Sequence, residues 1–78
     1  MLMSTIGSEF GLAVMTRIMK KSGAERVSDE AANELRAILE EIAITISKHA
    51  NELSHHAGRK TIKSGDIRLA YKNTIKQM

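Results

Sequence analysis

The 78-residue chain contains no cysteine, no proline and no tryptophan, and its aromatic residues are limited to Phe10 and Tyr71. Without cysteine, the chain has neither a disulfide nor a cysteine zinc site, the supports on which many small domains rely. A domain near this size buries only about 60% of the surface that its unfolded chain exposes, so a monomer would be marginally stable. The composition therefore raises the question of where the chain finds enough core.

Long apolar runs are also missing. No segment approaches the roughly 20 apolar residues that a membrane-spanning helix requires. Residues 1–6 lack the basic region and the long apolar stretch of a secretory signal. We therefore expect a cytoplasmic protein with no membrane partner, in which residues 1–8 form an extension and residues 9–78 a single domain.

Apolar residues recur at steps of three and four between Val27 and Gly58, and this period predicts one long helix. Ser28 is suited to cap its start, and Asp29 and Glu30 suit the positive end of the helix dipole. Gly58 is suited to end it. A helix over residues 29–57 would be about 43 Å long at roughly 1.5 Å per residue.

Two shorter helices are predicted on either side, over residues 12–22 and 64–76, and Gly23 ends the first of them. These arms are too short to cover the apolar stripe of the long helix, so an all-α, short–long–short chain would lack a closed core. We infer an obligate dimer, in which two long helices cross and the arms fold over them. Folding and association are inseparable in such dimers.

Two sequence motifs flank the long helix. Residues 22–31 read SGAERVSDEA, and residues 56–67 read HAGRKTIKSGDI. Together they resemble the archaeal histones, and the resemblance covers about residues 10–72. It implies a histone fold that pairs into an intertwined handshake homodimer, which agrees with the independent argument from helix length. It also implies binding to double-stranded DNA with little sequence specificity, and therefore association with the nucleoid.

The placement of charge is consistent with this resemblance. The formal net charge of +3 is weak evidence, because a small excess is usually a solvated surface. The basic residues, however, gather on the first helix and in the loops, where helix termini and loop amides bind phosphates well. A dimer would double the charge to about +6. The basic residues concerned are Arg17, Lys20, Lys21, Arg26, Arg59, Lys60 and Lys63.

The resemblance implies specific DNA-binding roles. Arg26 matches the loop arginine that enters the minor groove, where a guanidinium reads groove width rather than base identity. Thr61 matches the threonine that supports this arginine, and Lys60 matches the neighbouring lysine that contacts phosphate. In a handshake dimer these two lie beside Arg26 of the other chain. Arg17 and Lys20 match first-helix residues that face the DNA backbone. The alternative is that these side chains are ordinary solvated charges.

The same resemblance implies two structural roles. Arg59 and Asp66 match an ion pair within one chain that braces the second loop. Leu53, His56, Asp66 and Leu69 match the seam at which two histone dimers join. A contact between histidine and aspartate there would be sensitive to pH near the histidine pKa. The alternative is that His56 simply ends the long helix.

No catalytic or metal-binding constellation emerges from the sequence. His49 and His56 are seven residues apart and share a helix face, but the nearby acids are not at a recognisable ligand spacing. There is no cysteine nucleophile, glycine-rich phosphate loop or pair of carboxylates in a pocket. We expect no metal, no cofactor, no small-molecule substrate and no enzymatic activity.

The sequence departs from the family pattern at its start, where archaeal histones have prolines at the positions of Gly11 and Val14. Without them, the first helix is free to begin earlier, and Leu2, Ile6 and Phe10 would form a stripe that packs on another dimer. The alternative is a frayed tail. The departure leaves open whether a tetramer or a larger assembly forms, and whether DNA is wrapped, bridged or coated.

The sequence is compatible with two functions. The first is a histone-like architectural protein that compacts double-stranded DNA through the paired loops of its dimer. The second is a histone-fold interaction subunit of the transcription-factor type, in which the dimer mainly binds protein and DNA binding is secondary. The basic loops favour the first function.

Overall fold

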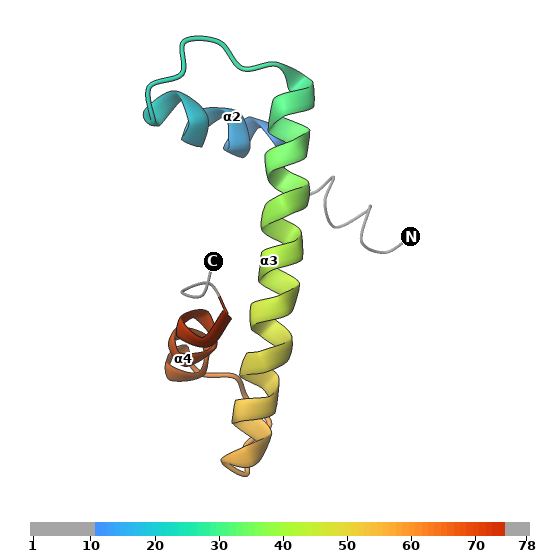
Figure 1. Cartoon of the computed structure of the whole chain (residues 1–78), viewed down its shortest axis with the longest axis vertical. Coiled ribbons are helices and arrows are strands. Elements are labelled where there is room, and N and C mark those ends of the chain that lie inside the picture. The colour runs from blue at the N-terminus through green and yellow to red at the C-terminus, as the bar shows by residue number, and fades with distance from the viewer. Residues whose placement is uncertain (1–10, 75–78) are drawn as a thin grey trace. The chain divides into compact units, whose positions relative to one another are not determined.

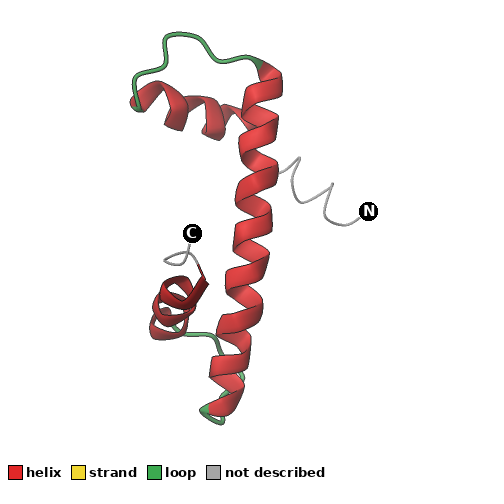
Figure 2. Ribbon diagram, in the orientation of Figure 1, coloured by secondary structure: helices red, strands yellow, loops and turns green. Residues whose placement is uncertain are grey.

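The computed structural model of the chain describes residues 11–74, which form three helices in the order short, long, short. Figure 1 shows α2 (Leu12–Lys21), α3 (Asp29–His56) and α4 (Ser64–Thr74). The described residues contain no strand (Figure 2). The all-α, short–long–short prediction is confirmed. The predicted ends of the first two helices differ from the observed ends by one residue, and residues 75 and 76 lie outside the described part.

Two glycines end the first two helices by the same geometry. Gly58 has a φ of 73°, in the left-handed region that glycine adopts without strain. Its N–H donates to the carbonyl of His55 at 2.9 Å, and the N–H of Arg59 donates to the carbonyl of Ser54 at 2.9 Å. This pair of bonds is a Schellman motif, and it satisfies carbonyls that the helix leaves open. Gly23, with a φ of 115°, closes α2 in the same manner.

The start of α3 follows the sequence prediction. The hydroxyl oxygen of Ser28 accepts a hydrogen bond from the N–H of Ala31 at 3.0 Å. Asp29 and Glu30 occupy the first turn, where negative charge interacts favourably with the helix dipole. Local capping chemistry therefore defines both ends of the long helix.

The start of α2 agrees with the predicted start at residue 12, and not with the earlier start that the absence of proline left open. The helix begins at Leu12, because Gly11 has a φ of 83° and a ψ of 116°, outside the helical region. Without a proline, a glycine with a positive φ stops the helix instead. The predicted stripe of Leu2, Ile6 and Phe10 lies outside the described residues.

The chain divides into two compact units, residues 1–40 and residues 41–78, with the division inside α3. In the described part of the first unit the buried apolar residues are Met15 and Ala32. In the described part of the second unit, the buried apolar residues are Ala50 and Ala70. Met15 is thus the one large apolar side chain that is buried among residues 11–74. Within residues 11–74, a single chain therefore buries few of its own large apolar side chains.

The large apolar side chains that stay exposed occur on all three helices and in the second loop. Ile18 on α2 is 48% exposed and Ile38 on α3 is 46% exposed. Soluble monomers rarely leave so much apolar surface in contact with water, and such surface usually marks an interface. The full set is Leu12, Val14, Ile18, Ile38, Ile44, Ile62, Ile67, Leu69 and Tyr71. None of α2, α3 and α4 combines the length and apolar character that a bilayer crossing requires.

Candidate nucleic-acid interface

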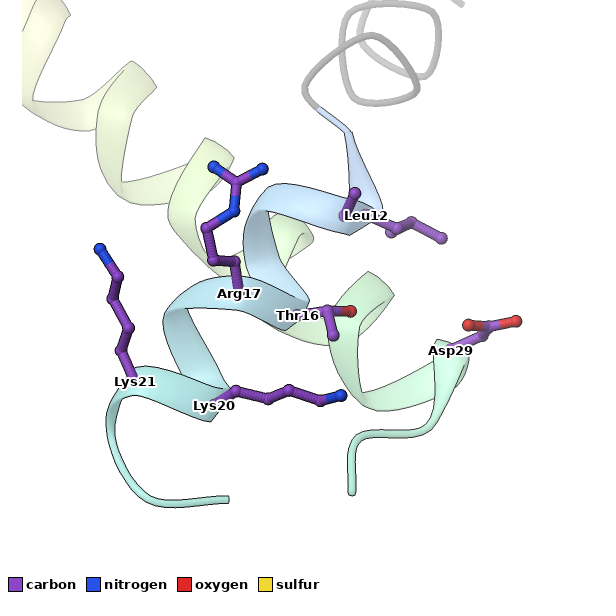
Figure 3. A pocket seen from close by; sticks show the side chains of 7 residues that line it. Leu12, Thr16, Arg17, Lys20, Lys21 and Asp29 are labelled. Carbon is purple, nitrogen blue, oxygen red and sulfur yellow. The ribbon is translucent and has the colours of Figure 1, made fainter. Parts of the chain in front are cut away.

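A basic surface pocket lies along α2. Arg17, Lys20 and Lys21 are exposed and line a pocket of about 590 Å³, together with Leu12, Ala13, Thr16 and Asp29. In Figure 3 the side chains of Arg17 and Lys21 extend to one side of the helix, and that of Lys20 runs along the other. Because α2 contains no acidic residue, its own charges are all positive. The helix therefore presents a surface suited to a polyanion.

The loop between α2 and α3 presents Arg26. Its side chain is exposed, and no hydrogen bond or ion pair within residues 11–74 engages its guanidinium. The loop itself is held at both ends, by the Schellman motif at Gly23 and by the Ser28 cap. A short loop that is fixed at both ends presents its arginine from a defined backbone position.

The loop between α3 and α4 is braced by an ion pair. Arg59 Nη1 donates to Asp66 Oδ2 at 2.9 Å, and Arg59 Nη2 donates to Asp66 Oδ1 at 2.9 Å. This bidentate arrangement is the strong form of an arginine–carboxylate contact. Arg59 Nη1 also donates to the carbonyl of Thr61 at 2.8 Å. The pair that the sequence predicts therefore also holds the loop backbone.

Asp66 is positioned by the first turn of α4. It is the third residue of that helix, and its Oδ2 accepts the N–H of Lys63, the residue before the helix, at 2.8 Å. A carboxylate at this position satisfies a backbone donor that the helix leaves open. The hydrogen bond from Arg59, followed by that from Lys63, lowers the pKa of Asp66 from 3.8 to about 2. The hydrogen bond to Asp66 raises the pKa of Arg59 in turn.

This pKa shift makes stability depend on pH. Because the folded-state pKa of Asp66 lies below its unfolded value, the carboxylate stabilises the fold above about pH 4. That contribution is lost as the pH falls from 3.8 towards 2. We expect wild type to unfold at a higher temperature than Asp66→Asn at pH 6, and the gap to narrow below pH 4. Thermal unfolding of both proteins between pH 6 and pH 2 measures this difference in unfolding temperature.

The control for this experiment is Glu34→Gln, which neutralises an exposed carboxylate on α3. Its effect on the unfolding temperature should be small at every pH, because an exposed side chain gains little from folding. A gap between wild type and Asp66→Asn that stays constant from pH 6 to pH 2 would contradict the assignment.

Lys60 and Thr61 are exposed in the second loop. The carbonyl of Thr61 is used internally, since it accepts from Arg59 Nη1 at 2.8 Å. Their expected proximity to Arg26 is a contact between two chains, and it stays a prediction. Within residues 11–74, no ion pair engages Arg17, Lys20, Arg26 or Lys60.

Sequence reasoning missed Ser54. The residue is completely buried in α3, and its hydroxyl lies 3.1 Å from the carbonyl oxygen of Arg59 and 3.0 Å from that of Thr61. The available signal was a serine four residues after Ala50, on the apolar side of the helix. A polar residue at such a position indicates a specific hydrogen-bond partner, but the helical period does not identify that partner.

The four residues predicted for a seam between dimers all lie within residues 41–78. Leu53 is half-buried, and His56 and Leu69 are exposed. Asp66 is buried, and its two oxygens already accept three donors within the chain. A histidine from another dimer would therefore have to use the remaining lone pair on Oδ1. The seam stays a prediction.

His49 of α3 takes part in two polar contacts. His49 Nε2 lies 3.3 Å from the amide nitrogen of Asn73, and its Nδ1 lies 3.7 Å from a carboxylate oxygen of Glu52. The described residues contain no group of three or more side chains from His, Asp and Glu that is arranged to hold a metal ion. Within the second unit, His49 thus contacts both α3 and α4.

Comparison with known proteins places these features in one family. The family described as histone-like transcription factor (CBF/NF-Y) and archaeal histone matches residues 8–71. One of the subunits of archaeal histone HAN1 from Thermococcus zilligii is 51% identical over 65 residues, which are 83% of this chain and 97% of that protein. Probable archaeal histone 3 from Methanocaldococcus jannaschii is 43% identical over 63 residues, 81% of this chain and 94% of that protein.

A third relative is the DNA-binding protein HmvA, also from Methanocaldococcus jannaschii. It is 41% identical over 56 residues, which are 72% of this chain and 58% of that protein. The family match contains α2, α3 and both loops, and it ends within α4. The match therefore includes the exposed basic residues of α2 and of the two loops.

Proposed function

The chain belongs to the family of histone-like transcription factors and archaeal histones, and we propose that it is an architectural protein that binds double-stranded DNA with little sequence specificity. The observation that carries this proposal is the set of exposed basic side chains on α2 and the two loops, Arg17, Lys20, Arg26 and Lys60, none of which forms an ion pair within residues 11–74. Charges that are not used inside the protein remain available to neutralise phosphates.

The proposed mechanism is charge neutralisation and mechanical guidance of DNA, with no chemical step. Arg17 and Lys20 on α2 face the DNA backbone, and Lys60 contacts phosphate. Thr61 supports Arg26 of the other chain. Arg26 enters the minor groove, where its guanidinium responds to groove width and tolerates different base sequences. Such contacts fix the register of protein on DNA without reading bases.

We propose that the functional unit is an intertwined handshake homodimer, with residues 9–78 as the histone-fold domain and residues 1–8 as an extension. The exposed apolar side chains on all three helices support this assembly, because a single chain buries only one large apolar side chain in its described part. A second copy supplies the missing core. In that dimer, Arg26 of one chain lies beside Lys60 and Thr61 of the other.

Larger assemblies are proposed to form through Leu53, His56, Asp66 and Leu69. The Thermococcus zilligii relative is named as one subunit of a histone, which fits a protein that works within an assembly. A tetramer would bridge or coat DNA, and an open stack of dimers would wrap it. Nuclease digestion of the protein–DNA complex distinguishes these two assemblies, since a regular ladder of protected DNA fragments indicates wrapping.

Because the proposed ligand is chromosomal DNA, we propose that the protein is associated with the chromosome.

The proposed function is tested by Arg26→Ala. We expect the variant to bind several unrelated DNA duplexes roughly tenfold more weakly than wild type, equivalent to about 1.4 kcal/mol, and to lose a similar factor on each. The uniform loss follows from a contact that reads groove width rather than sequence. Gel-shift titrations on random-sequence duplexes measure it.

Lys48→Ala is the matched control, because it removes one exposed positive charge from α3, away from both loops. Its affinity for duplex DNA should stay within about twofold of wild type. A loss confined to one DNA sequence would indicate a specific regulator. No binding of wild type to random duplex DNA would favour the protein-interaction function instead.

A further inference from the structure

The buried hydroxyl of Ser54 is directed at the loop between α3 and α4 rather than at its own helix. A serine or threonine inside a helix commonly donates to the carbonyl four residues earlier. Thr45 on α3 does this, donating to the carbonyl of Glu41 at 3.0 Å. Ser54 instead lies 3.1 Å from the carbonyl of Arg59 and 3.0 Å from that of Thr61. Its partners are therefore five and seven residues further along the chain.

These two carbonyls bracket the proposed DNA contact. The carbonyl of Arg59 belongs to the peptide group that joins Arg59 to Lys60. The carbonyl of Thr61 belongs to the peptide group that joins Thr61 to Ile62. A serine hydroxyl has one proton, so the two acceptors share it. Both carbonyls are drawn inward to a side chain that is 0% exposed. Lys60 and Thr61 stay exposed between them.

The ion pair of the second loop does not duplicate this restraint. Arg59 Nη1 holds the carbonyl of Thr61 at 2.8 Å, so that peptide group has two side-chain donors. Within residues 11–74, the carbonyl of Arg59 receives a side-chain hydrogen bond from Ser54 alone. Without that hydroxyl, the peptide group before Lys60 would be free to rotate. The direction in which Lys60 leaves the backbone depends on that peptide group.

We infer that Ser54 is a positioning residue for DNA binding, which acts by fixing the peptide groups on both sides of Lys60 and Thr61. This inference rests on the proposed function, because it assigns Ser54 an effect on the phosphate contact. An ordered loop holds the lysine in place before DNA arrives, so less conformational freedom is lost on binding. Alanine would fill the buried position almost as well, as it does at Ala50 and Ala70, but it could not hold the loop.

The test is a double-mutant cycle on DNA affinity, measured on one random-sequence duplex at one salt concentration. The variants are Ser54→Ala, Lys60→Ala and the two combined. We expect Ser54→Ala alone to weaken binding roughly three- to tenfold, the range for loss of a buried hydrogen bond. In the Lys60→Ala background the same change should cost less than about twofold, because the lysine is gone and the carbonyl of Thr61 is still held by Arg59 Nη1.

Ala50→Gly is the matched control for a general loss of stability. Ala50 is as buried as Ser54 and lies one turn earlier in α3, and glycine there weakens the helix without removing a loop hydrogen bond. It should lower the unfolding temperature but leave DNA affinity within about twofold when binding is measured well below that temperature. If circular dichroism shows that Ser54→Ala does not fold, Ser54→Cys replaces it and is studied under reducing conditions. Cysteine nearly keeps the side-chain volume of serine, but its S–H group is a weaker hydrogen-bond donor.

The outcomes separate the inference from the proposed function. Equal losses for Ser54→Ala in both backgrounds, or no loss in either, would overturn the role of Ser54 while wild type still binds DNA. An equal loss of affinity in Ala50→Gly would also overturn it, because the effect would then follow stability. Failure of wild type to bind duplex DNA would overturn the proposed function first and the inference with it.

Discussion

Raising the salt concentration from about 50 mM to about 200 mM is expected to weaken binding to duplex DNA by roughly 10³- to 10⁵-fold. That range applies if each dimer neutralises roughly six to ten phosphates, because each neutralised phosphate releases a bound counterion. The basic groups that carry the proposal are exposed and form no ion pair within residues 11–74, so their charge acts on DNA directly. Fluorescence anisotropy titrations across a salt series measure the slope.

The same series tests individual residues. Lys60→Ala should lower the slope of log affinity against log salt by about 2 per dimer, because each chain loses one phosphate contact. Lys48→Ala should leave the slope unchanged, since its side chain lies on α3 outside both loops. An affinity that hardly changes with salt would refute charge neutralisation as the basis of binding.

Replacing an apolar residue of α3 is expected to break the dimer. Ile38 is 46% exposed in the single chain, and we expect a partner chain to cover the rest. Ile38→Gln would lose that apolar burial and leave an amide without a partner, at about 2 kcal/mol per chain. Each dimer carries the change twice, so its dissociation constant should rise by roughly 10³-fold, equivalent to about 4 kcal/mol.

Sedimentation equilibrium measures that dissociation constant, and Glu41→Gln is the control because it places the same residue at an exposed position of the same helix. The control should dimerise like wild type. Wild type should also unfold at a higher temperature as its concentration rises, since folding and association are linked. A wild-type protein that sediments as a folded monomer, with an unfolding temperature independent of concentration, would contradict the obligate dimer.

The helical plan was predictable because each of its determinants is local. Ser28 caps the start of α3, and Gly23 and Gly58 end α2 and α3 with a positive φ. Caps and glycines act within one turn of the residue that carries them, so their effect can be read from neighbouring residues in the sequence. The start of α2 at residue 12 was also predicted, although the loss of proline left an earlier start open. Gly11 interrupts the helix there through a backbone angle that the sequence allows but does not require.

The pairing of Arg59 with Asp66 was predictable from the motif, but its extent was not. The structure adds the N–H of Lys63 as a third donor to the carboxylate and extends Arg59 to the carbonyl of Thr61. These contacts set the pKa of Asp66, because the number of donors around a carboxylate decides how strongly its charged form is favoured. Sequence spacing does not supply that number.

By itself, the sequence determined three helices, an apolar stripe too long for the arms to cover, and basic residues concentrated on the first helix and in the loops. Periodicity and capping decide these features, and both depend on residues at most a few positions apart. Only the tertiary structure decided that Ser54 faces the second loop and reaches the carbonyls on either side of Lys60 and Thr61. That contact depends on the path by which the chain turns back after Gly58, and a hydrogen bond forms only where that path brings donor and acceptor within about 3 Å.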